Sequence, residues 1–269
     1  MGVLANWTKT CAPVLAGALI FGMAQESSKA ASRSVAKAAE CPAAGARVVQ
    51  FARALDGEGF VTSEGEEVRL SGILALASGD ERASAPAAAR DALAKALRDR
   101  TVTLAPAEPS HDRYGRTIAQ VFADQTWVQA ALLSAGEVRA APDAASAPCV
   151  KALLLAEAHA RQSGKGQWRA GFRVRDPDDI RNRVGSFQIV EGKVITASVT
   201  RGRAFINFGM DYRSDFTVTV EPDDMRIFRQ ARFDINALAG KRIRVRGWVE
   251  FYNGPEITIT TPAAIEVLE

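Results

Sequence analysis

The sequence predicts a β-rich α+β protein made of two small OB-type barrels in succession. Short runs that alternate apolar and polar residues, separated by turn residues, predict strands along most of the chain. In each half, three such runs come before a helical segment and two come after it, which is the element order of a five-stranded OB barrel. The length of 269 residues suits two small domains.

The first barrel, with helices packed on it, is predicted for residues 45–171. Its strands are expected at residues 46–51, 60–62, 67–70, 102–104 and 117–122. Its helices are expected at residues 85–98, 128–135 and 149–161, because small and apolar side chains recur there at helical spacing. In the first helix this spacing favours an apolar stripe through Ala88, then Ala92 or Leu93, and then Ala96 or Leu97.

A charged, proline-containing segment at residues 172–185 is predicted as a linker, and residues 186–269 as the second, OB-like domain. Alternation predicts that Phe205 and Val245 point inward and Arg203 outward. The strands of this domain are expected at residues 191–199, 203–208, 215–220, 242–251 and 256–260, with a helix at 225–231.

The N-terminal region predicts export. Lys9 precedes an apolar run from Ala12 to Ala24, which is too short for a comfortable membrane span but has the length of a signal-peptide core. Residues 1–24 are therefore predicted as a signal peptide and 25–44 as a disordered spacer. The alternative is an uncleaved membrane tether, and in either case the protein is expected to be periplasmic or secreted.

The cysteines favour one disulfide. Cys11 would leave with the signal peptide, so that Cys41 and Cys149 remain in an oxidising compartment. The alternative is a pair of separate buried thiols.

Five segments in register resemble the staphylococcal nuclease (thermonuclease) family. They are Asp56-Gly57-Glu58, Val68 to Ile73, His111 to Arg116, Trp127 to Leu133 with Gly136, and Leu154 to Arg161 with Gly166-Gln167-Trp168. The resemblance covers residues 45–171 and implies an OB-type barrel that hydrolyses phosphodiesters with one calcium ion, a glutamate base and two arginines.

Carried over position by position, the arginines of that family are present and most of its acids are not. The arginines match Arg69 and Arg116, and the first metal aspartate matches Glu58. Leu74 stands at the second metal position and Ala77 at the base position. Neither side chain binds calcium or takes a proton, so no metal ligand set and no cofactor are predicted.

The leading interpretation is therefore a catalytically inactive binding module for an envelope partner, a polyanion or nucleic acid. In it, Arg69 and Arg116 clamp a phosphate; the competing view is a structural role in which they pair with Glu58. A second function class is an active, calcium-dependent phosphodiesterase in which Asp80 or Glu81 rebuilds the acidic site. The third is a structural envelope protein.

One strand of the second domain offers a candidate basic face. Arg242, Arg244, Arg246 and Trp248 alternate with mostly apolar residues and so share one side of the strand, together with Glu250. Such a face binds single-stranded nucleic acid in some OB barrels and is simply solvated in most proteins. The net charge of +3 neither demands nor excludes a polyanionic partner.

Overall fold

The computed structural model describes residues 41, 45–75, 85–169, 171–211 and 213–268. The predicted signal segment, most of the spacer, and Ala77, Asp80 and Glu81 lie outside these residues. Residues Glu40–Glu269 form one compact unit. No helix in the described part of the chain is long and apolar enough to cross a membrane.

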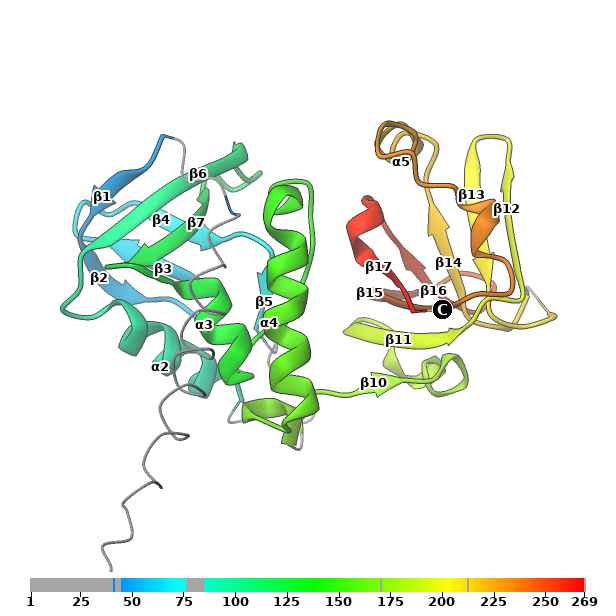
Figure 1. The fold of residues 1–269 in the computed structure, drawn as a ribbon, viewed down its shortest axis with the longest axis horizontal. Coiled ribbons are helices and arrows are strands. Elements are labelled where there is room, and N and C mark those ends of the chain that lie inside the picture. Colours follow the sequence, from blue (N-terminus) through cyan, green and yellow to red (C-terminus); the bar gives the residue numbers. More distant parts are fainter. Residues whose placement is uncertain (1–40, 42–44, 76–84, 170, 212, 269) are drawn as a thin grey trace, which may run out of the picture. The chain divides into compact units, whose positions relative to one another are not determined.

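The first sheet is a nearly closed barrel with strand order β1-β6-β7-β4-β3-β2 (Figure 1). Only Gln50 separates β1 from β2, so the two halves of one long strand pair with β6 and β3 at the two ends of this path. Within the path, β4 and β7 are parallel and the other neighbours antiparallel. The strands are β1 (Arg47–Val49), β2 (Phe51–Ala54), β3 (Gly59–Thr62), β4 (Glu67–Leu70), β6 (Val102–His111), β7 (Thr117–Ala123) and β8 (Thr126–Trp127), which pairs with β7.

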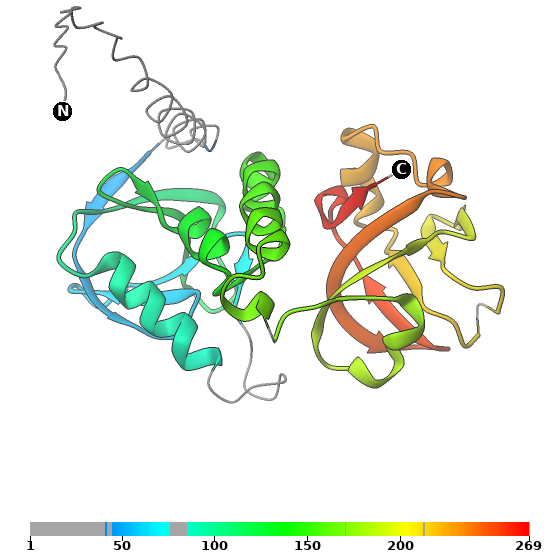
Figure 2. The same cartoon turned by 60° about the horizontal axis from the view of Figure 1, so that its bottom comes forward.

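Three helices cover this barrel: α2 (Ala85–Leu97), α3 (Val128–Ala135) and α4 (Val150–Gln162). Helices α3 and α4 pack side by side (Figures 1 and 2). In α2 the fully buried stripe is Ala89, Leu93 and Leu97, so Ala89 takes the place expected for Ala88. Gly136 ends α3 in the left-handed conformation, with φ of 77°.

A short strand pair and a disulfide join segments of this domain that lie outside the strands of the first sheet. Strand β5 (Ile73–Leu74) pairs with β9 (Arg139–Ala140), which places Leu74 opposite Arg139. A disulfide joins Cys41 to Cys149, with their Cα atoms 4.8 Å apart, as the sequence predicts. Cys149 closes the short 3₁₀ helix η1 (Ala147–Cys149), so the bond ties the entry segment to the start of α4.

The second sheet has the strand order β10-β11-β15-β16-β14-β13-β12, with β17 beside β15. Only Val194 and Ile195 separate β11 from β12, and β14 and β16 are parallel. Its strands are β10 (Val174–Arg175), β11 (Phe187–Lys193), β12 (Thr196–Thr200), β13 (Arg203–Asn207), β14 (Thr217–Val220), β15 (Arg242–Phe251), β16 (Pro255–Thr258) and β17 (Ile265–Val267). Helix α5 (Met225–Gln230) lies between β14 and β15 in the chain.

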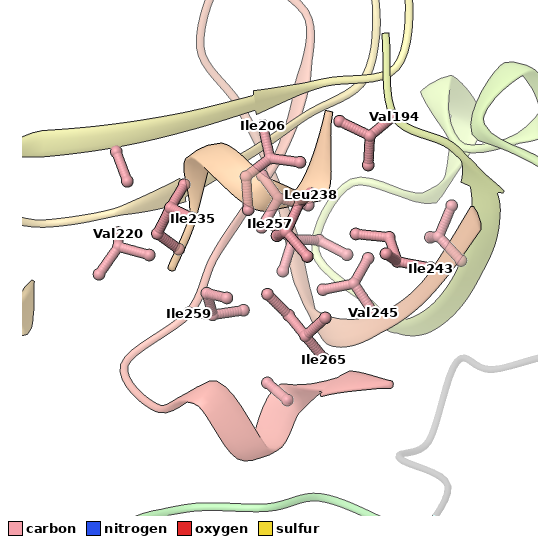
Figure 3. Close-up of a cluster of buried hydrophobic side chains, with 14 of the residues drawn as sticks. Val194, Ile206, Val220, Ile235, Leu238, Ile243, Val245, Ile257, Ile259 and Ile265 are labelled. Atoms are coloured by element: carbon pink, nitrogen blue, oxygen red, sulfur yellow. The ribbon is translucent and has the colours of Figure 1, made fainter. Parts of the chain in front are cut away.

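This sheet encloses its own apolar core, in which Ile206, Ile243, Val245 and Ile257 are fully buried (Figure 3). The inward position of Val245 is confirmed, whereas the prediction for Phe205 is wrong. Phe205 is two residues from Arg203 and shares its face, so the Arg203 guanidinium lies 5.3 Å from the Phe205 ring centroid.

The segment predicted as a linker takes part in the second fold. Strand β10 pairs in parallel with β11. Ile180 lies between the short 3₁₀ helices η3 (Pro177–Asp179) and η4 (Arg181–Arg183), and its side chain is fully buried in the second core. One apolar residue among charged neighbours is enough to hold this stretch against the sheet.

Candidate functional site

Glu58 and Arg69 lie side by side on neighbouring strands of the first barrel. Glu58 directly precedes β3, and its backbone oxygen accepts a hydrogen bond of 2.8 Å from the Leu70 N–H. In β4, Val68 and Leu70 point into the core, so Arg69 between them points to the other side of the sheet. Strand pairing therefore brings together one acidic and one basic residue that the family resemblance singled out.

Glu58 is poised between its two protonation states at neutral pH. Burial raises the pKa of Glu58 to about 7, although the positive charge of Arg69 works in the opposite direction. Asp56 adds to the rise, while the Ala75 N–H, 3.3 Å from Oε2, and the more weakly acting Arg116 oppose it. A carboxyl group with a pKa near 7 both takes up and releases a proton at neutral pH.

Arg116 is held by its own loop. Its Nε donates to Asp112 Oδ2 at 2.7 Å, and Asp112 Oδ1 accepts from the backbone N–H groups of Tyr114 and Arg116. Burial opposes ionisation of Asp112, but these hydrogen bonds keep its pKa below the usual value. If Arg116 has a purely structural role, its partner is therefore Asp112, with which it forms an ion pair, and not Glu58 as predicted.

The position that the resemblance matches to the second metal aspartate holds a leucine. Leu74 lies in β5 and lines the same cleft as Arg69. Among the residues that the structure describes, no cluster of three or more acidic, histidine or cysteine side chains is arranged to hold a metal ion. The suggested replacements Asp80 and Glu81 lie outside this part of the chain.

The cleft beside Arg69 has a volume of about 350 Å³ and is shared by both sheets. The first barrel contributes Arg69 and Leu74, and the second contributes Trp248 and Glu250 from β15 and Thr258 from β16. The sequence did not predict that residues of both sheets line one cleft, because alternation identifies the face of a strand but not the residues that lie opposite that face. The only signal was the presence of Trp248 among charged residues.

Arg246 connects the two sheets through a buried ion pair. Its Nη1 donates to Glu157 Oε2 at 2.7 Å and to the Ala140 carbonyl at 3.1 Å, and its Nη2 pairs with Glu266. Arg246 and Glu157 are both almost completely buried, and Glu157 also accepts the Ala140 N–H at 2.8 Å. Strand β15 is therefore fixed to helix α4 of the first barrel.

The predicted basic face is neutralised over most of its length. Glu191 accepts hydrogen bonds from Arg242 at 2.9 Å and from Arg244 at 2.6 Å, and Arg246 is buried. Of the four predicted residues, Arg242 and Trp248 are exposed; Arg242 is paired with Glu191, and 48% of the surface of Trp248 is exposed. The strand presents an aromatic ring, and not a row of uncompensated cations.

The strand order of the first sheet, together with Arg69 and Arg116 beside an acidic residue, defines a nuclease-like OB barrel. Residues 67–170 match the family model described as staphylococcal nuclease homologue, which confirms the resemblance for this domain. The match begins at β4, so Glu58 precedes it. No curated protein matches the chain.

Proposed function

We propose that this protein is an exported, nuclease-like binding module that holds its ligand without hydrolysing it. The observation that carries the proposal is Leu74, which lines the cleft beside Arg69 at the position of a metal carboxylate. The nuclease-like barrel supplies the scaffold and the arginines, while the acids that would activate water are missing.

Calcium chemistry is poorly supported at this site. Calcium takes about six to eight oxygen ligands at about 2.3–2.6 Å, mostly from carboxylates. Glu58 is the one acid at the carried-over positions, so these positions would supply a calcium ion with a single carboxylate. With Ala77 at the base position, general-base assistance worth about 10²–10⁴-fold is lost as well.

The second sheet is, in this proposal, also an OB-like barrel. Its strands β11 and β12 act as the two halves of one long first strand, as β1 and β2 do in the first barrel. The parallel pair β14·β16 corresponds to β4·β7, and α5 corresponds to α2 in chain order. This support comes from pairing order alone.

Export is the expected setting of this function. The apolar run before Ala24 supports a secretion signal, and the Cys41–Cys149 disulfide fits an oxidising compartment. The partner is then a component of the cell envelope. The N-terminal residue of the mature protein, read by mass spectrometry, tests this part, and an intact N-terminus on cytosolic material contradicts it.

Incubation of the purified protein with single-stranded DNA and RNA, with calcium and with chelator, tests the missing catalysis. We expect no calcium-dependent cleavage. Cleavage that requires calcium and disappears in Arg116→Ala would replace the proposal by the phosphodiesterase.

A gain-of-function experiment tests the register of the resemblance. The triple variant Glu58→Asp, Leu74→Asp and Ala77→Glu returns the carried-over acids to the barrel. Weak calcium-dependent cleavage by this variant, absent when Arg69→Ala is added, would show that chemistry and not architecture was lost.

A second candidate function rests on Glu58. A carboxyl group with a pKa of about 7 next to Arg69 has the properties of a general acid or base. Under this candidate, the rate of phosphodiester hydrolysis changes through one ionisation near pH 7, and hydrolysis is abolished by Glu58→Gln. Our proposal expects no hydrolysis at any pH.

A further inference from the structure

Most of the polar wall of the cleft comes from the second sheet. Trp248 and Glu250 project from β15, and Thr258, Thr260 and Thr261 come from β16 and the residues after it. Val249 pairs with Ile257, which sets Trp248 beside Thr258 across the two strands. One flat aromatic ring, a carboxylate residue and three threonines therefore line the same space.

Trp248 is held in place while its indole remains accessible. Its ring makes an edge contact with Phe187, with centroids 6.1 Å apart and planes at 80°. Nearly half of the residue is exposed, which is unusual for the largest apolar side chain. A fixed, accessible ring at a cleft wall is a surface on which another flat, partly apolar group stacks.

The charges of the cleft do not favour a polyanion. Among the charged lining residues, Arg246 is already neutralised by Glu157 and Glu266. Arg69 then faces two carboxylates, those of Glu250 and Asp143. A chain of phosphates would meet more negative than positive charge, and the resulting repulsion offsets the attraction to Arg69.

The same groups suit a neutral ligand that is rich in hydroxyl groups. The exposed carboxylate of Glu250 accepts hydrogen bonds, and the exposed hydroxyl of Thr260 both donates and accepts them. The Arg69 guanidinium donates to a neutral oxygen as well as to an anion. A volume of about 350 Å³ lies within the range of small-ligand sites.

From this combination we infer that the cleft binds a sugar unit of a glycan chain, with the apolar face of the sugar ring stacked on Trp248. OB barrels use their strand faces and hairpin loops for oligosaccharides as well as for oligonucleotides. The inference rests on the proposed function, because it names the ligand class of a site that binds without cleaving. In this inference the second sheet provides Trp248 as the stacking surface, and the first barrel provides Arg69 as a hydrogen-bond donor.

The test is calorimetric titration of the purified full chain with chitotetraose, cellotetraose and maltotetraose, and with an oligothymidylate at low salt. We expect at least one tetrasaccharide to bind and the oligothymidylate not to bind. Binding should change the tryptophan fluorescence of the protein, and this change should be lost in Trp248→Phe although binding persists.

Trp248→Ala should weaken tetrasaccharide binding by about tenfold, the effect of losing one aromatic stacking contact. The matched control is Phe251→Ala, which removes an exposed ring from the other face of the same strand and should leave the affinity unchanged. Binding of the oligothymidylate alone, no binding of any probe, or equal losses in the two alanine variants would each overturn the inference. The cleavage assay judges the proposed function separately.

Discussion

The two sheets pair their strands in the same order but use their charged residues differently. In each, a first strand is divided into two consecutive segments, and one parallel pair joins the third strand to the last. The first sheet contributes Arg69 to the cleft, whereas the second buries Arg246 against α4. The first matches a family model and the second lies outside that match.

This difference shows which part of a barrel depends on particular residues. Strand pairing needs backbone hydrogen bonds and an apolar residue at every second position, conditions that many sequences meet. The resemblance to the family rests instead on particular residues, such as those of the Asp112–Arg116 loop with its hydrogen-bonded aspartate. A sheet without those residues can have the same pairing order without carrying the motif.

The largest difference in stability between the two sheets is expected when the disulfide is removed. Cys149→Ser opens a loop with a sequence separation of 108 residues, and the loop-entropy model predicts a loss on the order of 5 kcal/mol. In urea unfolding followed by fluorescence, the first barrel of the variant should unfold at a lower urea concentration than the second sheet. Cys41→Ser should give the same loss, and an unchanged midpoint in Cys149→Ser would contradict the prediction.

The next effect should come from the ion pair that joins the halves. Arg246→Ala leaves Glu157 buried with its main counter-charge removed, which costs about 3–5 kcal/mol. The exposed Arg242 pairs with Glu191 at the surface, so Arg242→Ala should cost no more than about 1 kcal/mol. Thermal unfolding of both variants measures the difference, and similar losses would show that burial is not the cause.

The smallest effect concerns pH and Glu58. Its pKa is raised from 4.5 to about 7 in the folded protein, so the folded state binds the proton more tightly than the unfolded state. The stabilisation is complete below about pH 4.5 and is lost as the pH rises toward about 7.

Glu58→Gln should therefore flatten the fall in stability over that range, by up to about 1.4 kcal/mol per pH unit. Denaturation at several pH values measures the slope. Asp124→Asn, an exposed acid in the same barrel, should leave the slope as it is, and an equal change in both variants would rule out Glu58 as the source.

Much of the fold could be predicted from the sequence because its signals are local. Alternation and turn residues located the strands, the motif segments located the first barrel, and two cysteines indicated the disulfide. The prediction for Phe205 failed because position along a strand was judged by side-chain type and not by parity with Arg203. Ile180 was missed because a single apolar residue gives no periodic signal.

The cleft itself could not be predicted, because it depends on contacts between residues far apart in the sequence. Trp248 and Arg69 line the same cleft, although no sequence pattern in either segment predicts that the two come together. The burial of Arg246 could not be predicted either. Its position on a charged strand face predicted exposure, but Glu157 on α4 supplies the counter-charge that permits its burial.

The Arg246–Glu157 contact also bears on how far this chain is modular. A family model that ends at residue 170 suggests a natural place to divide the protein. A fragment that ends there would keep the carboxylate of Glu157 and lose the guanidinium that neutralises it. The family match therefore ends inside a structure whose two sides are joined by the Arg246–Glu157 ion pair, and Arg246 pairs in turn with Glu266 of β17.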